Sequence, residues 1–144
     1  MHKEKTNMMK SFLDRHGITQ LWVIKQLDVP WSTFDYFTGE HGFREDVALS
    51  LVKIIHDVGK KLSKFKFGKD HIADFDFLKN ECGIQHRHLG KQIGIKISGS
   101  LAWRVKCGLS PSEQAILLAS LKETAQACSA FELPKESIRQ SKAA

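Results

Sequence analysis

The sequence predicts an all-α protein, and three observations support this fold class. Apolar residues recur at steps of three and four along most of the 144-residue chain, which is the period of amphipathic helices. Gly and Pro residues separate these segments at the positions where helices end and begin. Only residues 63–77 alternate apolar and charged side chains, so a short hairpin there is the one alternative to helix.

The composition is typical of a soluble globular protein, with 42% hydrophobic and 26% charged residues. No apolar run approaches the roughly 20 residues that a membrane-spanning helix needs, and residues 1–10 are too charged for a signal peptide. The three cysteines, Cys82, Cys107 and Cys128, are too few and too scattered for a disulfide framework. We therefore expect a cytoplasmic protein that makes no membrane contact.

The net charge of +6 is concentrated in the middle of the chain. Residues 61–107 carry ten basic and four acidic side chains, whereas the segments on either side are neutral. A local positive field attracts polyanions, and nucleic acid is the first of these to consider. A solvated, lysine-rich surface without a ligand is the alternative interpretation.

Four helices are predicted within residues 8–62. Gly17 ends the first, a second begins near Thr19, and Pro30 fits the first turn of a third that ends near Gly39. The fourth has the most regular apolar stripe in this half of the chain: Val47, Leu51, Ile54, Ile55, Val58 and Leu62.

The second and third of these helices resemble the helix-turn-helix of repressor-type DNA-binding proteins (the lambda repressor, Cro and XRE family). The matching segments are Gly17-Ile18-Thr19-Gln20, Val23-Ile24-Lys25-Gln26-Leu27-Asp28-Val29 and Ser32-Thr33-Phe34. Ile24 and Asp28 depart from the family, which usually has a small residue and Gly at these positions. The resemblance implies a helical bundle that binds double-stranded DNA.

The apolar pattern repeats at an offset of 66 residues. Gly17-Ile18 returns as Gly83-Ile84, and Lys25-Gln26-Leu27 returns as Lys91-Gln92-Ile93. The segment from Leu89 to Ile95 resembles the same family and has Gly at both positions where the first copy departs from it. We interpret the repeat as a second helix-turn-helix.

The predicted architecture is therefore two tandem lambda-repressor-like bundles of about four to five helices each. The first spans residues 1–62, a linker spans 63–73, the second spans 74–131, and a mobile tail spans 132–144. The second recognition helix should start between Ser98 and Leu101. The last helix should begin with a capping box in Ser110-Pro111-Ser112-Glu113.

The family resemblance also implies which residues contact DNA. Residues at the start of the second helix of each motif would hold a phosphate, and exposed residues early in the third would read base edges in the major groove. The predicted contacts are Gln20, Trp31, Ser32, Thr33, Tyr36, His86, Arg87, Lys91, Lys96, Ser98, Ser100 and Arg104.

The predicted function is a sequence-specific transcriptional regulator, a repressor of phage or mobile-element type. The first recognition helix has no Lys or Arg and carries Trp31 and Tyr36, which favours an alternative. In that alternative the chain is a protein-interaction module such as an antirepressor, an antitoxin or a host-takeover protein. A third interpretation is a single helical domain whose second half serves dimerisation. The stripe of the last helix would serve either a homodimer or packing within the chain.

No enzymatic motif and no cofactor motif is present, so we expect neither catalysis nor a cofactor. A zinc site formed by Cys82, His86, His88 and Cys107 is not expected. The spacing does not fit the known finger spacings, and the two histidines would point to different faces of a helix.

Overall fold

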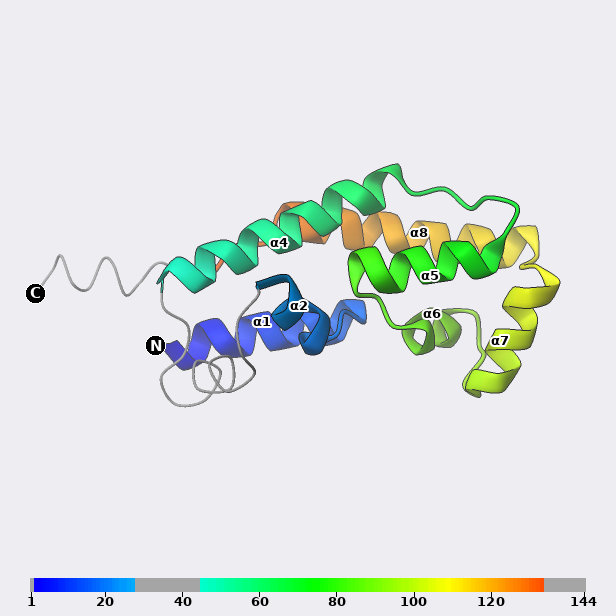
Figure 1. Cartoon of the computed structure of the whole chain (residues 1–144), viewed down its shortest axis with the longest axis horizontal. Helices are drawn as coiled ribbons and strands as arrows, with labels where there is room; N and C mark the ends of the chain where they lie inside the picture. Colours follow the sequence, from blue (N-terminus) through cyan, green and yellow to red (C-terminus); the bar gives the residue numbers. More distant parts are fainter. Residues whose placement is uncertain (1, 28–44, 134–144) are drawn as a thin grey trace, which may run out of the picture.

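The computed structural model describes residues 2–27 and 45–133 (Figure 1). The described part is all-helical, as predicted, with one isolated backbone bridge and no strand. Within it no helix has both the length and the hydropathy to cross a bilayer. The predicted third helix and most of the predicted tail lie outside the described residues. The helices are α1 (His2–His16), α2 (Gln20–Leu27), α4 (Glu45–Lys64), α5 (His71–Cys82), α6 (His86–Gln92), α7 (Ser98–Cys107) and α8 (Pro111–Ser129).

Residues 63–77, for which a hairpin was the alternative to helix, form the end of α4, a connection and the start of α5. Asp70 caps α5, because its carboxylate accepts hydrogen bonds from the backbone N–H groups of Ile72 (3.1 Å) and Ala73 (3.2 Å). This cap turns the alternating Asp–Phe residues 74–77 into a helix. Local capping chemistry thus outweighs the strand-like pattern.

The long helices α4 and α8 run antiparallel, side by side along the molecule (Figure 1). They approach closely at Gly59, where a Cβ atom would lie 3.0 Å from the backbone oxygen of Ala125. These two small residues are separated by the repeat offset of 66. The apolar stripe of α8 is buried against α4 within the chain, which is the second of the two uses that the sequence allows for it.

A second contact joins equivalent positions of the two copies. Ile18 and Ile84 form an antiparallel bridge. The N–H of Thr19 donates to the oxygen of Gly83 (3.1 Å), and the N–H of Gln85 donates to the oxygen of Gly17 (2.9 Å). Thr19 is equivalent to Gln85 in the repeat, and Gly17 is equivalent to Gly83, so each hydrogen bond is the counterpart of the other. The two copies therefore face each other across a local two-fold axis.

The two copies share one hydrophobic core. Phe65, inside the predicted linker, is only 9% exposed and belongs to the same cluster. Residues 63–73 thus separate the copies along the chain but not in space. The prediction of two bundles assumed that each copy buries its own stripe, whereas here the stripe of α4 is covered by α8 of the other copy. Core residues of the two copies include Met9, Leu13, Val23, Leu51, Ile55, Phe75, Leu78, Leu89, Leu117 and Leu121.

Candidate nucleic-acid interface

Helices α6 and α7, with the turn between them, occupy the residues for which the sequence predicts a second helix-turn-helix. Gly94 occupies the turn with φ +78°, a conformation that favours glycine. At Gly90 a Cβ atom would lie 2.8 Å from the oxygen of Ile95 and 2.9 Å from the side chain of Leu101. The small residue therefore permits the close crossing of the two helices. Helix α7 begins at Ser98, within the predicted window.

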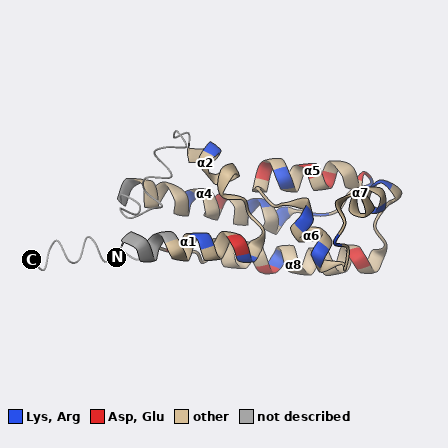
Figure 2. Cartoon of the chain, turned by 90° about the horizontal axis from the view of Figure 1, so that it is seen from below, with Lys and Arg blue, Asp and Glu red and all other residues tan. Residues whose placement is uncertain are grey.

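Most of the predicted contact residues of this motif are exposed. Arg87 and Lys91 on α6, Lys96 in the turn, and Ser98 and Ser100 in the first turn of α7 are all exposed. In the view from below, basic residues lie on α6 and near it on α5 and α7 (Figure 2). The structure thus brings Arg87, Lys96 and Ser98 together around one concave surface, whereas Lys91 and Ser100 share only their exposure with these residues.

A groove of about 460 Å³ lies between the start of α2 and the end of α5. Its basic side chains are Lys25, Lys79 and Arg87, and no acidic residue lines it. The indole N–H of Trp22 donates to the oxygen of Asn80 (2.9 Å) and fixes one wall. The groove therefore offers an anion three positive charges without a competing carboxylate in its lining.

Sequence reasoning missed two of the cations in this groove. Lys25 and Lys79 are far apart in the chain and meet only because α2 of the first copy packs beside α5 of the second. One signal was present, since Lys25 and Lys91 occupy equivalent positions of the repeat. The groove needs α2 of the first copy beside α5 and α6 of the second. The sequence repeat does not indicate that the two copies fold onto each other in this way.

His86, a predicted DNA contact, is half-buried and bonded within the protein. Its Nε2 lies 3.0 Å from the backbone oxygen of Phe75. A carbonyl oxygen only accepts, so Nε2 carries the proton and donates. The imidazole also packs against the Phe75 ring at 5.3 Å between centroids. This ring anchors α6 to α5, and its role as a DNA contact stays a prediction.

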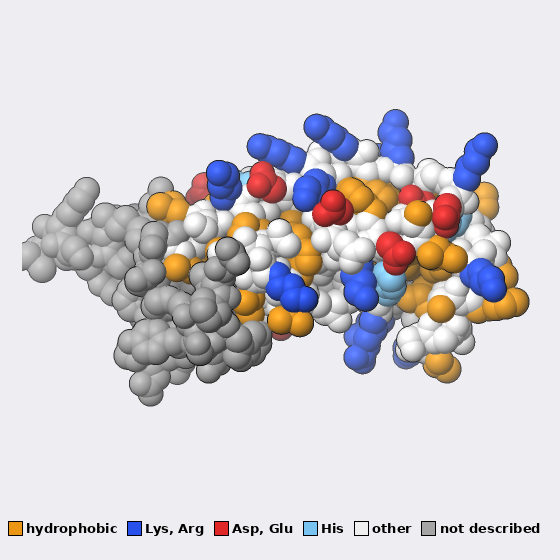
Figure 3. All heavy atoms as spheres, in the orientation of Figure 1, with side chains coloured by type: hydrophobic (Ala, Val, Ile, Leu, Met, Phe, Trp, Pro, Cys, Tyr) orange, Lys and Arg blue, Asp and Glu red, His pale blue; other side chains and the backbone are white. Residues whose placement is uncertain are grey.

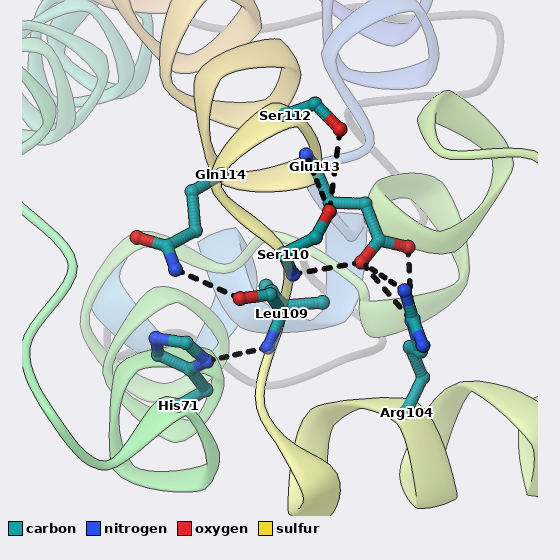
Figure 4. A network of polar contacts seen from close by, with 7 residues as sticks. All are labelled: His71, Arg104, Leu109, Ser110, Ser112, Glu113 and Gln114. Carbon is teal, nitrogen blue, oxygen red and sulfur yellow. Dashed lines mark hydrogen bonds and ion pairs between the residues drawn. The ribbon is translucent and has the colours of Figure 1, made fainter.

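Arg104 is also engaged by another side chain. Its guanidinium forms an ion pair with Glu113 at 2.8 Å, and Nε donates to both carboxylate oxygens at 3.0 and 3.1 Å (Figure 4). The same carboxylate accepts from the N–H of Ser110 (2.9 Å), which completes the predicted capping box of α8. The Arg104 guanidinium holds the pKa of Glu113 below its ordinary value. Contact of Arg104 with DNA stays a prediction.

The remaining predicted contacts belong to the first copy. Gln20 is the first residue of α2 and is half-buried, while Thr19 caps the helix by accepting from the N–H of Trp22 at 3.1 Å. Four more lie outside the described residues: Trp31, Ser32, Thr33 and Tyr36.

In the described part of the chain, no three His, Cys, Asp or Glu side chains come together in a geometry that would hold a metal ion. Cys82 and Cys128 are buried, and burial raises the pKa of their thiols to about 11 and about 12. They are therefore apolar core residues at neutral pH.

In comparisons with known proteins, no protein-family model, no curated protein sequence and no solved structure matches the chain.

Proposed function

We propose that the protein is a sequence-specific regulator of transcription that binds double-stranded DNA through repressor-like helix-turn-helix motifs. The observation that carries the proposal is the geometry of α6 and α7: a close crossing at Gly90, a left-handed turn at Gly94, and exposed Arg87, Lys91 and Lys96 around it. In our proposal each copy of the repeat is one such motif. In this proposal the two motifs belong to one body with a common hydrophobic core, and not to two separate bundles.

The proposed roles follow from the charge and the position of each group. Arg87, Lys91 and Lys96 neutralise phosphates, which makes affinity depend on salt. Ser98 and Ser100 lie in the first turn of α7, where polar side chains of a recognition helix reach base edges. The groove that contains Lys25 and Lys79 extends the positive surface toward α2 and gives the phosphate backbone a continuous path.

The proposal is tested by selecting bound sequences from a random pool and then measuring mobility shifts with the selected duplex. Charge reversal of Arg87 and Lys91 together should abolish the shift at moderate salt. Ser98→Ala with Ser100→Ala should reduce discrimination between the selected duplex and a scrambled one, by about 1–3 kcal/mol per lost base contact. Lys53→Glu with Lys60→Glu, at two exposed positions of α4, makes the same change in net charge and is the matched control, which should retain binding.

The salt dependence gives a second measure of the same contacts. The slope of log affinity against log salt should become shallower by nearly one for each phosphate contact that is lost. Absence of any shift by the wild-type protein at low salt would exclude the proposal. Equal loss of binding from Lys53→Glu with Lys60→Glu would mean that only the net charge of the protein matters.

A second candidate function is docking of a protein partner on α7. Ile97, the N-cap residue of α7, and Trp103 within α7 are 69% and 66% exposed, which is high for large apolar side chains. Trp103→Ala with unchanged DNA binding and lost partner capture would favour this function, which corresponds to the interaction module that the sequence leaves open.

A further inference from the structure

A concave apolar surface lies between α5 and α7, and it shares His86 and Arg87 of α6 with the basic groove. The pocket has a volume of about 600 Å³, within the range of sites that bind small molecules. Its walls include Ile72 and Phe75 from α5, and Leu101 and Val105 from α7. In Figure 3 hydrophobic atoms are exposed in this region, beside a histidine and with both acidic and basic side chains around them.

The rim of the pocket is positively charged. Arg87, Lys96 and Lys106 line it, against the single carboxylate of Asp76. Among the described residues no carboxylate forms an ion pair with any of these three cations. A ligand with one negative charge would therefore be attracted to the rim without displacing a salt bridge.

The start of α7 adds to this charge. Ile97 is the N-cap residue of α7 and forms no side-chain cap, and both Ile97 and Ser98 line the pocket. The positive end of the helix dipole and uncapped N–H groups therefore lie at the mouth of an apolar cavity. The exposed Ile97 side chain, which has no apolar cover in the described part of the protein, forms one edge of that mouth.

We propose that this pocket binds a hydrophobic monocarboxylic acid, with the apolar body between α5 and α7 and the carboxylate at the rim formed by Lys96, Lys106 and the first turn of α7. Apolar walls alone would suit any oily ligand, and basic residues alone would suit any anion. Their combination in one cavity selects a molecule with both parts. The pocket shares Arg87, Lys96 and Ser98 with the proposed DNA surface, but the proposal does not rest on DNA binding, because its apolar walls take no part in the DNA contacts and the ligand is tested without DNA.

The test uses the full-length protein, with octanoate, decanoate and dodecanoate as probes below their micelle concentrations and 1-decanol as the neutral control. Affinity measured by calorimetry should rise about tenfold for every two added methylene groups. Decanoate should bind at least about tenfold more tightly than 1-decanol. In NMR spectra the methyl signals of Ile72, Ile97, Leu101 and Val105 should shift on addition of decanoate.

Two variants locate the site. Lys96→Gln with Lys106→Gln should weaken decanoate binding about tenfold and leave 1-decanol unaffected. Ala102→Trp, which places a large side chain on the pocket wall, should abolish binding of both probes. Lys53→Gln with Lys60→Gln, which removes two charges from exposed positions of α4, is the matched control, and circular dichroism should show that each variant is folded.

Three results would overturn the proposal. Equal affinity for decanoate and 1-decanol would show an apolar surface without anion preference. Affinity independent of chain length would show simple ion pairing on the surface. Methyl shifts confined to residues outside the pocket, with full binding by Ala102→Trp, would place the ligand elsewhere.

Discussion

Ile18 and Ile84 pair in an antiparallel bridge although they occupy equivalent positions of a 66-residue repeat. Gly59 and Ala125, equivalent in the same sense, meet where α4 crosses α8. The two contacts define an internal two-fold axis that makes one folded body of two copies. The predictions below test the contacts at this axis, the helix caps and the buried titratable groups.

The bridge requires glycine next to both of its isoleucines. Gly17 and Gly83 each have φ +71°, and a Cβ atom at these positions would lie 2.2 Å from His88 and 2.6 Å from Trp22. Gly17→Ala and Gly83→Ala should each lower the free energy of unfolding by at least about 2 kcal/mol, from left-handed strain together with overpacking. Urea denaturation measures this change.

Gly99→Ala is the matched control for those variants. It lies in α7, and nothing would contact an added Cβ atom. Because Ala favours helix more than Gly does, this change should raise the free energy of unfolding, by up to about 1 kcal/mol. Destabilisation of similar size at all three positions would mean that the bridge has no special requirement.

The shared core should unfold as one cooperative unit. Leu51 in α4 and Leu117 in α8 are fully buried and equivalent in the repeat. Leu51→Ala and Leu117→Ala should each cost about 2–5 kcal/mol and shift the same single transition, whether followed by circular dichroism or by tryptophan fluorescence. Two separate transitions, each affected by only one of the variants, would indicate two independent domains joined by a linker.

The capping box of α8 and its ion pair should contribute unequally to stability. Ser110→Ala removes the acceptor of the Glu113 N–H and should cost about 1 kcal/mol. Arg104→Gln should cost less, since exposed ion pairs contribute little. Denaturation of the single and double variants at low and high salt tests this order, because only the ion pair should weaken with salt.

Stability should fall as the solution becomes mildly acidic. Burial lowers the pKa of His16 and of His88 from the ordinary value of 6.5, aided by the nearby Arg15 and Lys91 respectively. Below pH 6.5 the unfolded chain therefore binds protons that the folded chain excludes, and the free energy of unfolding decreases until the lower folded pKa values are passed.

Denaturation midpoints between pH 7.5 and 4.5 measure this dependence. His16→Gln with His88→Gln should flatten the decrease over the upper part of this range, where few carboxylates titrate. Lys53→Gln serves as the control and should leave the slope unchanged. A slope that is the same in all three proteins would show that other groups cause the acid sensitivity.

The three cysteines should react at very different rates. Cys107 is exposed, whereas Cys82 and Cys128 are buried with pKa values of about 11 and about 12. Since the thiolate is the reactive form, a thiol reagent at pH 7.5 should label Cys107 rapidly and the other two only when the protein opens. Rapid labelling of Cys128 in native protein would contradict the closed packing of α4 on α8.

The features that the sequence predicted well depend on neighbouring residues. The capping box at Ser110, the turn at Gly94 and the close crossing at Gly90 are set by residues a few positions away, so local patterns suffice. Helical spacing also indicated which face of α4 and of α8 is buried. Helical spacing could not indicate that α4 and α8 pack on each other, because an apolar stripe has the same pattern whichever helix covers it.

The candidate site was predictable only within one copy of the repeat. Arg87, Lys91 and Lys96 follow from the motif around Gly90, whereas Lys79 belongs to no motif and joins them through packing. The involvement of Arg104 with Glu113 was hidden for a different reason. Nine residues and a change of helix separate the two, and the ion pair forms only because α7 ends where α8 begins.

The internal two-fold axis also has a consequence for assembly. In residues 2–27 and 45–133, the contacts between the copies join a segment before Phe65 to one after Asp70, and the short connection between α4 and α5 is the covalent link between the copies. If that connection straightens, two chains can exchange halves, with Ile18 of each chain bridging to Ile84 of the other and the same core rebuilt twice. The balance between closed monomer and exchanged dimer is then set by protein concentration and by the length of residues 65–70, not by any new interface.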